Sequence, residues 1–173
     1  MILIISGTNR TSNKTLSVCN FYKQEIEKKG AVAEVISLDQ LPDSFIKSDM
    51  YGSRSDTFKP IQEKITKCEK LIFIAPEYNG SIPGILKTFI DGCDFPQSFK
   101  GKKAALVGIS SGRHGNLRGI SHLTGILNYM GVTIMPDKMY IQNINGELSE
   151  TGEILIASTE KYIQRQIDSF LEF

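Results

Sequence analysis

A short apolar run near the N-terminus constrains the fold more than any other feature of the chain. Residues 2–5 are all branched aliphatic side chains, with no alternation between apolar and polar positions. A strand of this kind is buried on both faces, as in the centre of a parallel sheet. Residues 71–75 (LIFIA) and 103–109 (KAALVGI) also have the character of buried strands, and a polar loop rich in small residues follows each of the three runs.

The segments between these runs complete an alternation of strands and helices in one domain over residues 1–173. Such an alternation favours a parallel sheet covered by helices. Five strands are expected, the last one interrupted, at residues 2–5, 33–38, 71–75, 103–109 and 132–135 with 138–141. Five helices are expected at residues 14–29, 58–67, 83–94, 116–130 and 150–173. The connection at residues 39–57 is long for a compact domain, which is typical of a functional or covering loop.

Composition excludes several classes of protein. Hydrophobic residues make up 40% of the chain and the formal net charge is +1, which argues against a nucleic-acid or membrane partner. No apolar run approaches the roughly 18 residues of a membrane helix. The three cysteines lack metal-ligand or CxxC spacing, so reduced core thiols and a cytoplasmic location are expected. No metal cluster or catalytic triad is visible, and Lys100, Lys102 and Lys103 are expected in a solvated turn.

The loop at residues 6–13 has the character of an anion site. It leads into a helix N-terminus, where free backbone N–H groups and the helix dipole favour a phosphate. It is neither a Walker A loop nor a GxGxxG loop. The alternative is a plain polar loop that supplies an N-cap Ser or Asn. The candidate phosphate-binding residues are Thr8, Arg10, Ser12, Asn13 and Thr15.

The loop that begins at Pro76 suits a flat heterocycle, because its prolines and glycines let the backbone approach a ligand closely. Three alternatives remain open: an ion pair of Glu77 with Lys87 or another basic residue, an interface or lid position for the Tyr78 ring, and simple turn chemistry at Asn79-Gly80. The candidate residues are Pro76, Glu77, Tyr78, Asn79 and Gly80.

The loop after residue 109 is expected to close the other side of the ligand, since loops at the carboxyl ends of parallel strands line one crevice. Of the two histidines, His114 lies in this loop, and His122 is expected to be packed or exposed on a helix. The candidate residues are Ser111, Gly112, Arg113 and His114.

Residues 76–91, PEYNGSIPGILKTFID, resemble the PEYNxSxPGxLKNxID signature of the NAD(P)H-dependent FMN reductase family. Residues 6–13 resemble the GSxRxxS phosphate loop of that family, and the likeness extends to about residue 141. Thr8 stands where Ser is commoner, Thr88 replaces Asn, and the spacing from Arg10 to Ser12 is one residue shorter than in many members. Which of Ser12, Asn13 and Thr15 contacts the phosphate is therefore left open.

The resemblance implies a flavodoxin-like three-layer sandwich with a five-stranded parallel sheet of order 2-1-3-4-5. It also implies a bound FMN that carries the chemistry, so that no catalytic side chain is required. NADPH or NADH would donate hydride, and a quinone, free flavin or azo compound would accept the electrons. A homodimer or homotetramer is expected, with residues 39–57, including Met50 and Tyr51, near the flavin of a neighbouring subunit. The alternatives are a flavodoxin-type electron carrier and a non-enzymatic FMN-binding module.

Overall fold

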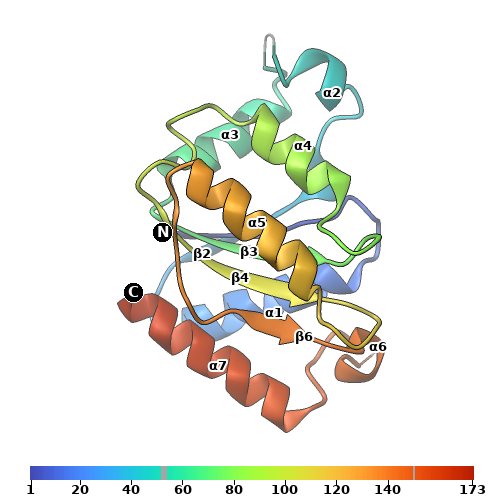
Figure 1. Ribbon diagram of the computed structural model, residues 1–173. Coiled ribbons are helices and arrows are strands. Elements are labelled where there is room, and N and C mark those ends of the chain that lie inside the picture. The colour runs from blue at the N-terminus through green and yellow to red at the C-terminus, as the bar shows by residue number, and fades with distance from the viewer. Residues whose placement is uncertain (52–53, 150) are drawn as a thin grey trace.

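The computed structural model describes residues 1–51, 54–149 and 151–173 and shows a twisted sheet between two layers of helices (Figure 1). The strands are β1 Ile2–Ser6, β2 Ala33–Ser37, β3 Lys70–Pro76, β4 Lys103–Ile109, β5 Thr133–Ile134 and β6 Met139–Ile141. The helices are α1 Lys14–Lys28, α2 Phe45–Ser48, α3 Phe58–Lys67, α4 Gly84–Gly92, α5 Leu117–Tyr129, α6 Ile144–Glu147 and α7 Ala157–Glu172, with a 3-10 turn η1 at Leu38–Gln40.

The sheet has the order β2-β1-β3-β4-β5, and every pairing in it is parallel. β5 and β6 pair with the same edge of β4. β5 pairs with the start of β4, at Lys103 and Ala104, and β6 pairs with its end, at residues 107–109. The predicted strand order and the interrupted fifth strand are both confirmed. Since β1 lies directly against β3, the loops that follow these two strands leave the sheet side by side.

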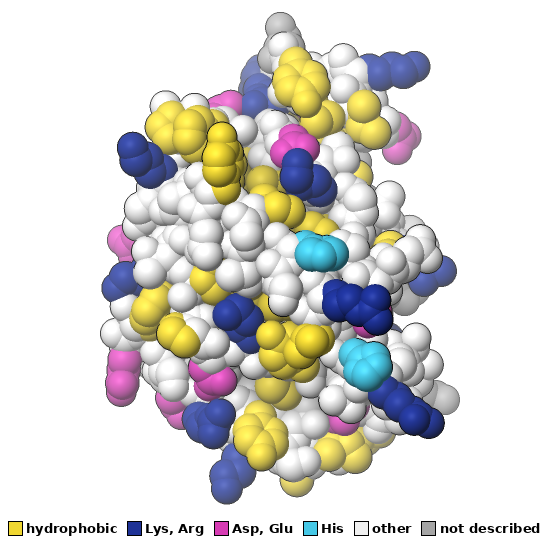
Figure 2. Space-filling model, viewed as in Figure 1, with side chains coloured by type: hydrophobic (Ala, Val, Ile, Leu, Met, Phe, Trp, Pro, Cys, Tyr) yellow, Lys and Arg dark blue, Asp and Glu magenta, His cyan; other side chains and the backbone are white. Residues whose placement is uncertain are grey.

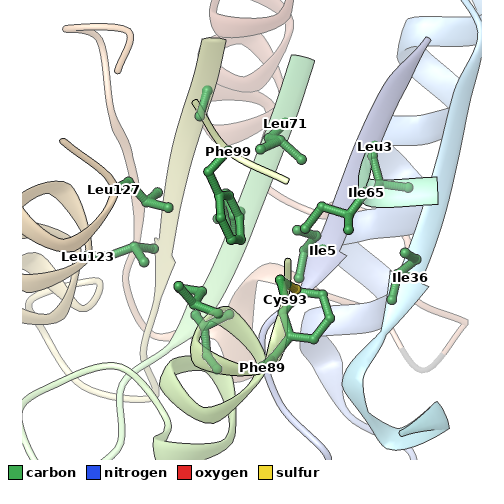
Figure 3. Packing of buried hydrophobic residues seen from close by; sticks show 14 of the residues in the cluster. Leu3, Ile5, Ile36, Ile65, Leu71, Phe89, Cys93, Phe99, Leu123 and Leu127 are labelled. Atoms are coloured by element: carbon green, nitrogen blue, oxygen red, sulfur yellow. The ribbon is translucent and has the colours of Figure 1, made fainter. Parts of the chain in front are cut away.

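The unbroken apolar run of β1 is explained by two cores, one on each face of the sheet. Leu3 and Ile5 point into the core beneath α3, α4 and α5, whereas Ile2 and Ile4 point into the core beneath α1 and α7. Figure 3 shows the first of these cores, in which Phe89 and Leu123 lie over the central strands. Within the described residues, no helix is long and apolar enough to cross a bilayer.

Two expectations from the sequence are wrong. The last helix begins at Ala157 instead of near residue 150, because Gly152 takes a positive φ of 87° and Leu148 pairs with Ile154 in an antiparallel bridge. Lys102 is not solvated: its buried ammonium donates hydrogen bonds to three backbone carbonyls at the C-terminal end of α3. Carbonyls at a helix C-terminus lack partners within the helix and favour a cation, so Lys102 stabilises α3.

The three cysteines are free and buried, as expected for core thiols. Burial raises the pKa of the thiols of Cys19, Cys68 and Cys93. The connection at residues 39–57 holds η1 and α2, and residues 52 and 53 lie outside the described residues. Phe45 of α2 packs against Phe58 of α3 with the two rings tilted by 52° and their centroids 4.8 Å apart, which anchors the described part of this connection to the core.

Candidate functional site

Three loops meet at the carboxyl ends of the central strands, the edge of an open parallel sheet where ligands bind. We call them the first loop (residues 7–13, after β1), the second loop (residues 77–83, after β3) and the third loop (residues 110–116, after β4). Figure 1 shows them at the right of the view, with α1, α4 and α5 starting from them. The predicted convergence of the three loops is confirmed.

The first loop presents a row of backbone donors. Asn13 caps α1: its side chain accepts a hydrogen bond of 2.8 Å from the Leu16 N–H and donates one of 2.5 Å to the Arg10 carbonyl. Ser12 takes a positive φ of 50° and turns the chain into the helix. Among the described residues, no protein acceptor lies within hydrogen-bond distance of the backbone N–H groups of residues 12–15. The N-cap alternative is thus correct for the Asn13 side chain, and the backbone donors stay free for an anion.

The second loop is closed by a tight turn. The Tyr78 and Ser81 backbones exchange hydrogen bonds of 2.9 and 3.1 Å, and the two residues between them, Asn79 and Gly80, have φ values of 53° and 77°. Two positive φ values in a two-residue hairpin loop define a type I′ turn, for which Asn-Gly is the preferred sequence. Turn chemistry therefore accounts for Asn79-Gly80.

The turn also determines which backbone donors of the second loop remain available. The Glu77 N–H donates to the Ile109 carbonyl at 2.8 Å, and Pro76 has no N–H. In the part of the chain that the structure describes, the N–H groups of Asn79 and Gly80 have no protein acceptor. The tip of the turn is thus the part of the second loop that can read the edge of a ligand.

Tyr78 joins the second loop to the first. Its hydroxyl shares a hydrogen bond of 2.7 Å with the hydroxyl of Thr8, which is only 1% exposed. The Arg10 guanidinium lies over the Tyr78 ring, with its carbon 5.6 Å from the ring centroid. Thr8 also accepts a hydrogen bond of 3.3 Å from the Arg10 N–H. Thr8 stands where Ser is commoner in the family, and its hydroxyl fixes the position of the first loop relative to the second.

The third loop is held from below by Asn116 and Ser110. The buried Asn116 amide donates a hydrogen bond of 3.0 Å to the Ala75 carbonyl, next to the start of the second loop. The Ser110 hydroxyl donates to the Gly112 carbonyl at 3.0 Å and accepts from the Gly115 N–H at 2.9 Å. These contacts leave the side chains of Arg113 and His114 exposed at the edge of the site.

The loops enclose a cleft of about 530 Å³ that continues into a smaller hollow of about 270 Å³. These volumes suit a cofactor-sized ligand. The candidate residues that line the main cleft are Thr8, Arg10, Ser12, Asn13, Thr15, Pro76, Glu77, Tyr78 and Ser111. Those that line the smaller hollow are Glu77, Asn79, Gly80, Ser111, Gly112, Arg113 and His114. The structure thus brings all the candidate residues together around the cleft and its adjoining hollow.

Sequence reasoning missed one wall of the cleft. Ile144 and Asn145 of α6 line it beside the first loop. Residues 142–146 form a polar segment directly after β6, so the rule used for the other loops points to them as well.

The ion pair considered between Glu77 and Lys87 does not form. Lys87 instead pairs with Asp91, one helical turn away on α4, at 2.8 Å. Among the described residues, Glu77 has no cationic partner within salt-bridge distance, and its partly exposed side chain lines the cleft. His122 is exposed on α5, as expected, and its Nδ1 lies 2.8 Å from the Ser81 hydroxyl.

Comparison with known proteins identifies the family of the chain. Residues 1–146 match the sequence profile described as NADPH-dependent FMN reductase. The chain belongs to this family. The resemblance inferred from residues 76–91 is thereby confirmed, and members of the family use FMN with NAD(P)H as the electron donor.

One curated relative, the 2-hydroxy-1,4-benzoquinone reductase of a Burkholderia species, is 33% identical over 116 residues. The match covers 65% of this chain and 63% of the relative, so less than two thirds of the relative's length is matched.

Solved structures show the same fold. FerB from Paracoccus denitrificans, a flavoenzyme NAD(P)H:(acceptor) oxidoreductase, has a TM-score of 0.81 at 24% identity, with 99% of this chain and 94% of that chain covered. A flavodoxin from the domain Archaea has a TM-score of 0.64 at 15% identity, with 99% and 97% covered. Together with the strand order, these likenesses show that this member of the FMN reductase family has the predicted flavodoxin-like fold.

Proposed function

We propose that this chain is an NAD(P)H-dependent reductase that binds FMN in the cleft between the first, second and third loops. Its acceptor would be a small molecule such as a quinone, a free flavin or an azo compound. The observation that carries the proposal is a pair of backbone donor sets that have no protein acceptor among the described residues: residues 12–15 in the main cleft, and Asn79-Gly80 in the adjoining hollow. The first set suits a phosphate and the second suits the polar edge of a ring.

The phosphate of FMN would lie at the N-terminus of α1. The N–H groups of residues 12–15 and the helix dipole would bind it, with positive charge from Arg10 and Lys14, which both line the cleft. The side chain of Asn13 is already committed to capping α1 and to the Arg10 carbonyl. We therefore assign the side-chain contacts with the phosphate to the hydroxyls of Ser12 and Thr15.

The isoalloxazine ring would lie between the second and third loops. The Asn79 and Gly80 N–H groups would donate to its polar edge, and residues 111–114 would close the opposite side. When bound, FMN would supply the redox chemistry, taking hydride from the nicotinamide and passing electrons to the acceptor. The protein would hold the ring, bind negative charge at its edge through backbone donors and leave one face accessible.

A flavodoxin-type electron carrier is the second candidate, because the same fold occurs in the archaeal flavodoxin. The net charge of +1 and the benzoquinone reductase relative favour a reductase instead. The test is oxidation of NADPH and NADH by the purified, FMN-reconstituted protein, with menadione as the acceptor. A reductase turns over many equivalents, whereas a carrier or a non-enzymatic FMN-binding module shows almost no oxidation. Failure of the apoprotein to bind FMN would reject all three functions.

We further propose a homodimer or homotetramer located in the cytoplasm. Large aromatic side chains stand in solvent: Tyr51 is 86% exposed, Phe95 61% and Tyr129 89%. Such side chains are typical of protein contact surfaces when they gather in patches. Met50 packs against its own core, whereas the exposed Tyr51 is free to reach a neighbouring subunit. Light scattering that gives a monomeric mass at working concentration would reject the oligomer.

A further inference from the structure

A second groove begins at the phosphate end of the cleft and runs along α1, and we call it the side groove. Its near part encloses about 550 Å³ and its far part about 580 Å³, volumes typical of ligand sites. The two parts share Ser17 and Asn20. The residues that the near part shares with the main cleft are Ser12, Asn13, Lys14 and Asn145. The side groove is therefore continuous with the proposed phosphate site.

The side groove lies between two walls of hydrogen-bonded backbone. One wall is a single face of α1, since residues 17, 20, 21 and 24 follow one another at helical spacing. The other wall belongs to the segment after α6, at residues 148–149 and 151–154. Here the Ser149 N–H donates to the Glu153 carbonyl at 2.9 Å, and the Leu155 N–H donates to the Glu147 carbonyl at 2.8 Å. Both walls are thus built into the fold.

The charge of the side groove changes along its length. Among the described residues that line the near part, Lys14 carries the only charge, and it forms no ion pair with them. The far part is lined by Glu153 and Glu160. A phosphate is therefore favoured in the near part, next to Lys14 and the N-terminus of α1, and disfavoured in the far part.

The near part also has surfaces that suit a flat heterocycle. Leu16 and Leu148 line it, and both belong to the apolar core beneath α1 and α7. Within the described chain, the side-chain amides of Asn20 and Asn145 make no hydrogen bond, unlike the amide of Asn13, which caps α1. An asparagine amide both donates and accepts hydrogen bonds, as the edge of an adenine does. The near part thus offers apolar contact for the faces of a base and amide groups for its edge.

We propose that the side groove binds the adenylate half of FAD, so that the chain holds FAD as well as FMN. The inference rests on the proposed function, because the flavin must place its first phosphate at the N-terminus of α1. FAD is FMN extended at this phosphate by an adenylate, and the side groove begins there. The second phosphate would lie beside Lys14, and the adenosine would follow along the face of α1 that carries Asn20.

The nicotinamide donor also contains an adenylate, but its nicotinamide must reach the other end of the cleft. His114 lines the smaller hollow at that end, and Figure 2 shows the face of the molecule that carries both histidines. The side groove follows α1, which covers the opposite face of the sheet from α5 (Figure 1). The side groove therefore continues from the phosphate of the flavin and lies across the sheet from the ring end.

The test is calorimetric titration of the flavin-free protein with FMN and with FAD. The wild type should bind FAD no more than about 10-fold more weakly than FMN, because the contact of the second phosphate with Lys14 offsets the lost charge of the first. N20W places an indole in the side groove and should lower the affinity for FAD at least about 10-fold, with the FMN affinity and melting temperature unchanged. E27W is the matched control: Glu27 is exposed further along α1, outside the lining of the side groove, and the variant should bind both flavins as the wild type does.

Three results would overturn the proposal. They are wild-type protein that binds FAD more than 10-fold more weakly than FMN, N20W that loses less than 10-fold in FAD affinity, and N20W that loses as much affinity for FMN as for FAD. A KM for NADPH or NADH that rises in FMN-loaded N20W, with the FAD affinity unaltered, would assign the side groove to the donor and so also reject the proposal.

The reductase function is tested separately by turnover of menadione. An FMN-loaded protein that turns over but binds FAD poorly keeps the reductase function and loses this inference. A protein that binds FAD through the side groove but oxidises neither donor loses the reductase function alone. Binding of neither flavin would reject both.

Discussion

Replacement of Gly119 by Ala tests whether the packing of α5 against the second loop builds the site. A Cβ at position 119 would lie 2.1 Å from the Asn116 side-chain oxygen and 2.7 Å from the Ser81 carbonyl carbon. Neither neighbour can yield freely, because Asn116 is buried and bonded to the Ala75 carbonyl, and Ser81 closes the turn through its backbone. The substitution must therefore displace the Asn116 side chain, the second loop or both.

The expected magnitude follows from three opposing contributions. Alanine is favoured over glycine by up to about 1 kcal/mol within a helix, and this is an upper bound for Gly119, which lies in the first turn of α5. Overpacking in a tight site costs about 1–3 kcal/mol, and loss of the Asn116–Ala75 hydrogen bond costs about 1 kcal/mol more. We therefore expect G119A to lower the free energy of unfolding by about 1–3 kcal/mol. At about 2–4 °C per kcal/mol for a chain of this size, the melting temperature falls by several degrees.

The matched control lies on the same helix. Gly125 is exposed, and a Cβ there would have no neighbour within 4 Å, so G125A gains helix propensity without a clash. It should raise the free energy of unfolding by up to about 1 kcal/mol. Urea unfolding of the FMN-free proteins measures both effects, and a separate FMN titration should show weaker binding for G119A only. If G119A were as stable as G125A and bound FMN as tightly as the wild type, the argument that α5 positions the second loop would be refuted.

Two further substitutions test how helix ends are stabilised near and far from the site. N13A removes the cap that accepts the Leu16 N–H, which should cost about 0.5–2 kcal/mol of stability in urea unfolding, and S149A offers an exposed-turn comparison. A cost no greater than that of S149A would show that the cap is dispensable. K102M removes the buried ammonium at the end of α3. It should lower the free energy of unfolding by about 1.5–3 kcal/mol, the usual range for hydrogen bonds to a charged group. K100M, at an exposed position, should stay within about 0.5 kcal/mol of the wild type, and equal midpoints for the two variants would contradict the capping role of Lys102.

The sequence predicted the sheet because its strands are buried on both faces and therefore read as continuous apolar runs. The candidate residues of the three loops could be grouped for a similar reason: polar loops at the carboxyl ends of neighbouring parallel strands must meet. What could not be predicted depends on contacts between distant segments. The burial of Lys102 follows from its position under the end of α3, and a run of three nearby lysines gives no sign of it.

Arg118 and His122 illustrate the same limit at the site. Both lie on a helix whose sequence pattern shows only that they face away from the core. Their position beside the turn depends on Gly119, which lets α5 approach Ser81 closely enough for His122 to reach its hydroxyl. A sequence pattern gives the period of a helix, but the neighbour that its exposed face meets is decided by packing.

The backbone N–H groups that have no protein acceptor among the described residues of the cleft require particular backbone conformations. They belong to the backbone, at residues 12–15 and at Asn79-Gly80, so the site depends on conformation more than on side-chain chemistry. Ser12, Asn79 and Gly80 all have positive φ values, which β-branched residues adopt only at a cost. Side chains such as Thr8 and Asn13 act mainly by holding these backbones in place. Substitutions that preserve those conformations should therefore be tolerated in the loops, whereas changes that alter φ should weaken ligand binding without removing any charged group.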